Sequence, residues 1–198
     1  MKHLNSRLFF SLAVGLTLLT SACTHNRAVR VKRFNTQSVA GAQTSSAVAL
    51  VLDPAFTNYT YSYNMGGDTF KFPMGPTLVQ YATDAAQAAC RQVTVCGSRT
   101  EAPVGADAIL IPRVTRVNAT KCAGFAKRQF LIAVEWSLVD REAGKLLWLD
   151  TVAGQGEYDY AMSKGREKKM LQLGYDDLSR KTLQSLRESP AIANLRTK

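Results

Sequence analysis

The strongest constraint on the fold is a pair of alternating runs joined by a short polar turn. Residues 128–140, "RQFLIAVEWSLVD", place an apolar side chain at every second position, and after "REAGK" residues 146–158 return as "LLWLDTVAGQGEY". The apolar members of the first run are Phe130, Ile132, Val134, Trp136 and Leu138. Such alternation is typical of antiparallel strands that bury one face. We therefore predict a long β-hairpin whose apolar face is covered by other elements.

The position of the turn predicts which residues of this hairpin face each other. With its centre near Glu142, Trp136 lies opposite Trp148, in this register or in one displaced by a residue. Aromatic cross-strand pairs stabilise antiparallel sheets, so we expect the two indole rings to be in contact.

Two amphipathic segments supply the helices. The first is predicted over 76–92, with Pro76 in the first turn, where proline is tolerated. Its apolar positions recur at helical spacing: Leu78, Ala82, Ala85 and Ala89. The second helix shows the same spacing at Leu171, Tyr175, Leu178, Thr182 and Leu186. Ser189-Pro190 marks its end.

The remaining apolar runs predict further strands, over 47–53, 93–96 and 107–118. Pro112 cannot donate a hydrogen bond to a neighbouring strand, so the last of these is expected at an edge or with a bulge. Residues 59–64 and 68–72 alternate aromatic and polar residues around Gly66-Gly67, which predicts a hairpin. The order of elements predicts an α+β fold, a two-layer sandwich of an antiparallel or mixed sheet with two main helices packed on one face.

The N-terminal residues have the build of an export signal. Lys2 and Arg7 precede an apolar stretch from Leu8 to Leu19. As a helix this stretch reaches roughly 18 Å, short of the ~30 Å hydrocarbon core of a bilayer. We therefore expect a signal peptide rather than a membrane-spanning anchor.

The end of this segment, Leu19-Thr20-Ser21-Ala22-Cys23, resembles the lipobox of bacterial lipoproteins, although its leucine stands four places before the cysteine instead of three. The resemblance implies cleavage before Cys23 and alkylation of its thiol with diacylglycerol, so that this one residue carries several acyl chains, palmitate among them. The alternative is an ordinary cleavable signal in which Cys23 is incidental. Thr24, where inner-membrane lipoproteins of enteric bacteria tend to carry aspartate, implies the outer membrane.

The predicted organisation follows from this segment. Residues 1–22 are the signal peptide, 23–45 a lipidated, basic and flexible tether, 46–190 a single periplasmic domain, and 191–198 a tail. Without the signal peptide, 23 basic residues stand against 15 acidic ones, which favours anionic partners of the cell envelope over nucleic acid. Four tether cations either contact anionic headgroups or belong to a solvated stem: Arg27, Arg30, Lys32 and Arg33.

The sequence predicts no catalytic site, metal or cofactor. His3 and His25 are the only histidines, and both precede the domain, so it lacks an imidazole base. The carboxylates at strand ends, Asp53, Asp140 and Asp150, are expected to be structural, and Asp176-Asp177 are expected on the solvated side of a helix.

Three cysteines remain in the domain of an exported chain, where disulfides are favoured. One disulfide and one thiol is the simplest arrangement. The pair Cys90–Cys96 is preferred across a turn, and Cys96–Cys122 is the rival.

The runs "FPMGPTLVQYATDAAQAACRQVTV", "GADAILIPRV" and "VDREAGKLLW" resemble the periplasmic domains of the outer-membrane lipoproteins of the YajG, LpoB, PelC and CsgG groups. The resemblance implies a non-catalytic accessory or assembly protein that acts through protein contacts in secretion, assembly or wall synthesis. The alternative is a module that binds lipopolysaccharide or peptidoglycan. In that case Tyr59, Tyr61 and Tyr63 stack on sugars, unless they form a half-buried strand face.

Overall fold

The chain is described by a computed structural model over residues 24–26, 31–34, 43–65, 68–121, 127–159 and 166–195. Its main sheet has the strand order β5-β2-β6-β7-β8. These strands are β2 (Thr44–Val51), β5 (Cys90–Cys96), β6 (Ala108–Lys121), β7 (Lys127–Asp140) and β8 (Leu146–Asp159). β2 runs parallel to both β5 and β6, whereas β6, β7 and β8 are antiparallel. The predicted mixed sheet is confirmed.

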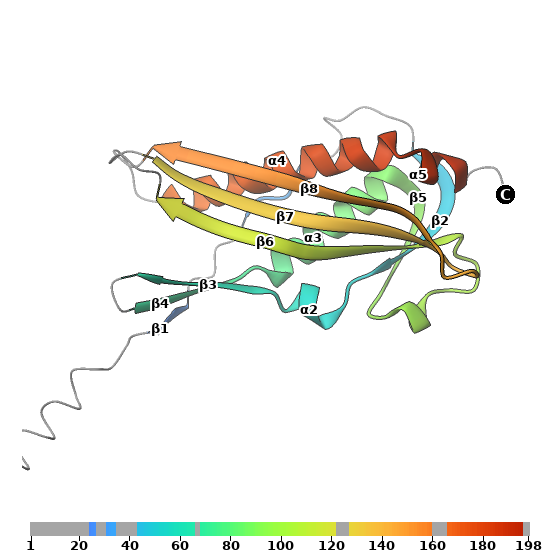
Figure 1. Cartoon of the computed structure of the whole chain (residues 1–198), viewed down its shortest axis with the longest axis horizontal. Coiled ribbons are helices and arrows are strands. Elements are labelled where there is room, and N and C mark those ends of the chain that lie inside the picture. Colours follow the sequence, from blue (N-terminus) through green and yellow to red (C-terminus); the bar gives the residue numbers. More distant parts are fainter. Residues whose placement is uncertain are drawn as a thin grey trace, which may run out of the picture.

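Two long helices, α3 (Gly75–Ala89) and α4 (Arg166–Glu188), lie behind this sheet in Figure 1. Buried apolar side chains from both helices and from the inner face of the sheet form one core. Its largest fully buried members include Trp136, Phe130, Leu78 and Leu178. The predicted two-layer α+β architecture, with two main helices on one face, is therefore confirmed.

A second, smaller sheet lies beside the main one (Figure 1). It has the order β1-β4-β3, from β1 (Thr24–Asn26), β3 (Thr60–Met65) and β4 (Asp68–Pro73). β3 and β4 form the predicted antiparallel hairpin, and β1 adds to β4 in parallel. Three short helices complete the described chain: α2 (Pro54–Thr57), η3 (Arg99–Glu101) and α5 (Pro190–Asn194). Within the described ranges, no helix is both long and apolar enough to span a bilayer.

The long hairpin forms, but the predicted tryptophan pair does not. Trp148 lies opposite Leu138, and Trp136 lies opposite Asp150. The turn explains the difference, because the Asp140 carboxylate accepts bonds from two turn amides and Gly144 adopts a φ of 63°. An irregularity after Leu138 displaces the register further. Trp136 instead donates its indole N–H to the buried hydroxyl of Tyr81, 3.1 Å away.

Of the two alternatives predicted for the strand of Pro112, the bulge is confirmed and the edge position is not, because β6 lies between β2 and β7 in the sheet. β2 pairs with β6 only at Ala108–Leu110, so the rest of β6, including Pro112, has β7 as its one main-sheet neighbour in the described chain. The bulge occurs between Val114 and Arg116. On its open side, the Ala119 N–H of β6 donates to the Tyr61 hydroxyl at 3.1 Å.

The preferred disulfide does not fit this fold. Cys90 and Cys96 occupy the two ends of β5, because α3 ends at Ala89, earlier than predicted, and no turn separates the two cysteines. Six steps along an extended strand span about 20 Å, whereas bridged cysteines have Cα atoms roughly 5.5 Å apart. The rival partner Cys122 lies outside the described residues.

Three glycines allow α4 to contact the sheet at the backbone. A Cβ atom at Gly156 would lie 2.1 Å from the carbonyl oxygen of Met170, and one at Gly154 would lie 2.3 Å from that of Gly174. A Cβ at Gly174 would lie 2.5 Å from the ring of Phe130. No side chain fits at these positions without moving the helix.

We therefore expect Gly156→Ala to destabilise the domain by roughly 1–3 kcal/mol, the usual cost of overpacking. Gly105→Ala is the matched control, because no atom lies within 4 Å of its Cβ position. Urea unfolding followed by circular dichroism measures both variants. Equal stability of the two would contradict the close helix–sheet contact.

Candidate functional site

Part of the predicted tether is docked on the domain. Residues 31–34, here called the strap, lie over the groove between α3 and α4. The strap backbone bonds to α4, since the Lys32 N–H donates to the Gln172 side chain at 2.6 Å and the Gln172 amide donates to the Lys32 carbonyl at 3.1 Å. Val31 and Phe34 are half-buried against the core. The strap is therefore attached by both polar and apolar contacts.

An ion pair fixes the strap to the other helix. The Arg33 guanidinium donates to both oxygens of Asp84 on α3, with the Nε bond at 2.8 Å. The Asp84 side chain is only 7% exposed, so its carboxylate has lost most of its contact with water and pairs with Arg33 instead. Hydrogen bonding to Asp84, together with its negative charge, raises the pKa of Arg33. One of the cations predicted for headgroup contact is thus engaged within the protein.

The strap, α3 and α4 together line a small hollow that is partly open to solvent. Tyr81 lines this hollow, and its hydroxyl lies 2.6 Å from that of Thr182. Burial raises the pKa of Tyr81, and the bonds with Thr182 and Trp136 lower it less, so the phenol stays protonated at neutral pH. Tyr175 also lines the hollow, and burial raises its pKa as well. These phenols therefore do not act as bases at neutral pH.

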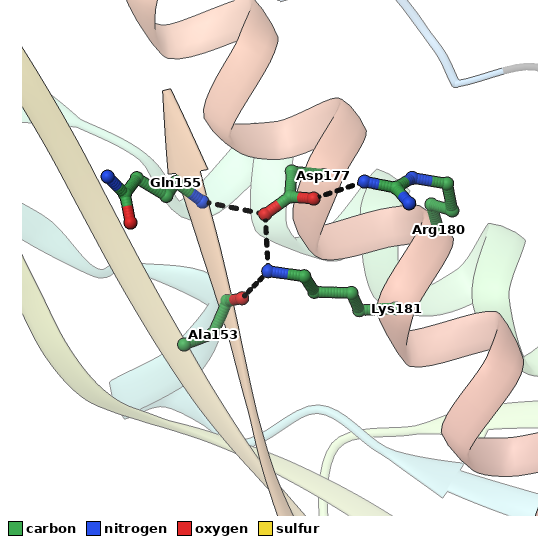
Figure 2. Close-up of polar contacts among 5 residues, drawn as sticks. All are labelled: Ala153, Gln155, Asp177, Arg180 and Lys181. Carbon is green, nitrogen blue, oxygen red and sulfur yellow. Dashed lines mark hydrogen bonds and ion pairs between the residues drawn. The ribbon is translucent and has the colours of Figure 1, made fainter. Parts of the chain in front are cut away.

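A second polar cluster attaches α4 to the open edge of β8 (Figure 2). Asp177 accepts from the backbone N–H of Gln155 at 3.0 Å, and Lys181 donates to the carbonyl of Ala153 at 3.1 Å. Asp177 also pairs with Lys181 at 2.7 Å and with Arg180 at 2.5 Å. Side chains of one helix thereby satisfy backbone groups that an edge strand would otherwise leave unpaired.

The charge of Asp177 is stabilised by its partners. Burial by itself raises the pKa of this carboxyl, but bonds from Lys181 and from the Gln155 amide, with the positive charges of Lys181 and Arg180, outweigh burial and hold the pKa below its usual value. The prediction that Asp177 belongs to a solvated helix face is therefore wrong, since its side chain is 16% exposed and bonded to a strand.

The other carboxylates singled out in the sequence also have structural partners. Asp53 caps α2 by accepting from the Phe56 N–H at 2.8 Å. Asp140 holds the β7–β8 turn, and Asp150 accepts from the Ser185 hydroxyl of α4. Within the described part of the chain, no three histidine, cysteine or acidic side chains gather as a metal site. That the protein is not an enzyme and uses no cofactor stays a prediction.

Two of the three predicted ligand tyrosines, Tyr61 and Tyr63, form an aromatic cluster with Phe72. Tyr61 and Tyr63 stack with ring centroids 6.1 Å apart, and Tyr63 stacks on Phe72 at 5.7 Å. Tyr59, Tyr61 and Tyr63 are all half-buried against the core. This packing favours the half-buried strand face over a sugar-stacking platform. Binding of lipopolysaccharide or peptidoglycan stays a prediction.

Other predicted site residues lie outside the described chain: Cys23, Arg27, Arg30 and Cys122. Of the predicted headgroup cations, Lys32 and Arg33 are described, and both are exposed. Sequence reasoning did not identify Asp84 as a functional residue. The one available signal was an aspartate on the apolar face of a predicted helix, between Ala82 and Ala85.

The outer face of the main sheet is apolar at one end. Ile109 and Val139 are buried in a small cluster separate from the main core, with Ile111 packed beside them. In the strand register, Leu146 lies opposite Val139, and Leu149 lies opposite Ser137, which is opposite Ile111. Leu146 and Leu149 are 51% and 52% exposed. We call Ile109, Ile111, Val139, Leu146 and Leu149 the end patch.

No family model matches the chain, and no curated protein matches it. Among solved structures, a DUF330-family protein from Xanthomonas campestris is 12% identical, with a TM-score of 0.52 over 87% of this chain and 97% of that one. A minor lipoprotein from Acinetobacter baumannii is 12% identical, with a TM-score of 0.43 over 74% and 93%. PelC from Paraburkholderia phytofirmans is 18% identical, with a TM-score of 0.43 over 75% and 95%. The first likeness shows a shared fold.

Asp177→Asn is expected to lower stability at pH 7 by roughly 1–2 kcal/mol, because charge-assisted bonds are lost. The pKa of Asp177 is lower in the folded protein than in the unfolded chain, where it is near 3.9. The stabilisation by the charged carboxylate is therefore fully present above the unfolded-state pKa, and it is lost as the pH falls through the folded-state pKa. Urea unfolding at pH 7 and pH 2 measures the difference. The exposed Glu188→Gln on the same helix is the control. A difference that persists at pH 2 would contradict the ionic origin.

Asp84→Asn is expected to release the strap, because the neutral amide no longer pairs with Arg33. Limited trypsin digestion with mass spectrometry should show cleavage after Lys32 or Arg33 several-fold faster than in the wild type. Glu142→Gln changes the charge equally on an exposed turn and should leave cleavage unchanged. An unaltered rate in Asp84→Asn would show that the ion pair does not retain the strap.

Proposed function

We propose that this protein is a non-catalytic lipoprotein, anchored by acylated Cys23 in the outer membrane, with its domain in the periplasm as an accessory or assembly factor for an envelope complex. The anchor rests on the lipobox resemblance and on Thr24 after the cysteine. The proposed non-catalytic role is supported by the bonds of the acidic side chains. These side chains hold a turn, cap a helix, bond to an edge strand and retain the strap.

The observation that carries the proposal is the end patch. Leucines at two positions of the β8 edge strand are half-exposed beside buried Ile109 and Val139. Val104, on the loop before β6, is 87% exposed. An exposed apolar patch with a polar rim is typical of a contact site between proteins, and the core of such an interface is more apolar than the rest of the surface. The patch therefore fits an apolar surface of an envelope protein.

Substitution within the patch tests this role. We expect a partner recovered after mild crosslinking in intact cells with the wild type to be lost with Leu149→Asp. Leu173→Asp is the matched control, because Leu173 is also exposed, at 40%, but lies on α4 behind the sheet. Thermal unfolding of both variants checks that they fold. Recovery of the same partner with Leu149→Asp, or its equal loss with Leu173→Asp, would contradict docking through the end patch.

A further inference from the structure

The N-terminal strand places the start of the described chain on a defined surface. β1 pairs in parallel with β4, with Thr24 opposite Thr69 and Asn26 opposite Lys71. Cys23 directly precedes Thr24, and consecutive Cα atoms lie 3.8 Å apart. The residue proposed to carry the lipid therefore directly precedes the edge strand of the small sheet in the chain.

We propose that the outward face of the small sheet lies against the anionic headgroups of the bilayer, an inference that rests on the proposed acylation of Cys23. A lipid attached one residue before β1 brings this edge of the sheet to headgroup depth. Thr60, Ser62 and Lys71 are exposed, whereas Tyr61 and Phe72 of the opposite face pack inward. The outward face is polar with one ammonium group, which suits adsorption to headgroups and not insertion between acyl chains.

The charge of the neighbouring elements fits the same orientation. The far ends of β6 and β8 and the start of α4 lie at the end of the molecule that holds the small sheet (Figure 1). Among the described side chains, Lys168 and Lys169 near the start of α4 are exposed, and so is Glu157 on β8. Together with Lys71, the exposed lysines at this end are attracted to an anionic leaflet within about a Debye length.

This orientation has a consequence for the end patch. β7 runs 14 residues from the end that holds the small sheet to the β7–β8 turn, which is about 45 Å of extended strand. Leu146 and Leu149 lie beside that turn. The end patch is thus held away from the membrane, where it is free to meet a protein partner. The domain acts as a spacer of fixed length because β1 and the strap limit its movement about the anchor.

Lipid photocrosslinking tests the orientation in the full chain. p-Benzoylphenylalanine replaces Ser62 on the small sheet or Thr94 on β5, both exposed. The purified lipidated proteins are reconstituted in phosphatidylethanolamine–phosphatidylglycerol vesicles. After irradiation, mass spectrometry should find lipid adducts at position 62 and at least tenfold fewer at position 94. Lys71→Glu should lower the adduct yield at position 62, whereas Arg91→Glu, an exposed charge on β5, should not.

Two failures are distinguishable in the same samples. Acylated Cys23 with equal adducts at positions 62 and 94, or with adducts only at 94, overturns the orientation and leaves the lipoprotein proposal standing. Unmodified Cys23 in the N-terminal peptide overturns both, because no lipid then holds β1 at the surface. Insensitivity of the yield to Lys71→Glu would overturn the electrostatic part of the proposal.

Discussion

The backbone contact between α4 and the edge of the main sheet determines the rest of the structure. Gly154, Gly156 and Gly174 carry no Cβ, so at these three positions helix and strand approach more closely than side chains would permit. Two features depend on this approach. Asp177 and Lys181 come within hydrogen-bond distance of the β8 backbone, and α4 takes the position beside α3 that forms the groove for the strap.

Protection of strand edges explains much of the polar structure. An unpaired edge exposes backbone donors and acceptors to pairing with other chains. β8 is covered at its middle by Asp177 and Lys181, and the open side of β6 is met by the Tyr61 hydroxyl. Asp177, Lys181 and Tyr61 are polar residue types that often bind ligands, but here they bond to backbone groups of strands and have a structural role. We propose the apolar end of the outer sheet face as the surface that meets a partner.

The fold was predictable from periodicity because one-sided burial repeats every two residues in strands and every 3.6 in helices. The β7–β8 hairpin, the β3–β4 hairpin and both long helices follow from that signal. Contacts between distant elements carry no such period. The predicted tryptophan pair was wrong because the turn around Asp140 shifts the register of the hairpin. The predicted cysteine pair was wrong because α3 ends at Ala89, which places both cysteines in β5. The solvated position predicted for Asp177 was wrong because its carboxylate bonds to Gln155, 22 residues earlier in the chain.

The two ends of the main sheet differ in the polarity of the surface that they expose. At one end lies the small sheet with exposed Lys71, near the exposed lysines at the start of α4. At the other end, the exposed leucines Leu146 and Leu149 of β8 lie on the same sheet face as a buried apolar cluster. The strap contacts both long helices, through Lys32 on α4 and through Arg33 on α3. The ion pair of Arg33 with Asp84 therefore attaches the strap to the helical layer, which the contact at Gly156 holds against β8. Under the proposed acylation of Cys23, loosening either contact would leave the lipid attached but would free the domain to rotate. The end patch would then lose its proposed fixed distance from the bilayer, which we propose limits the partners that it meets.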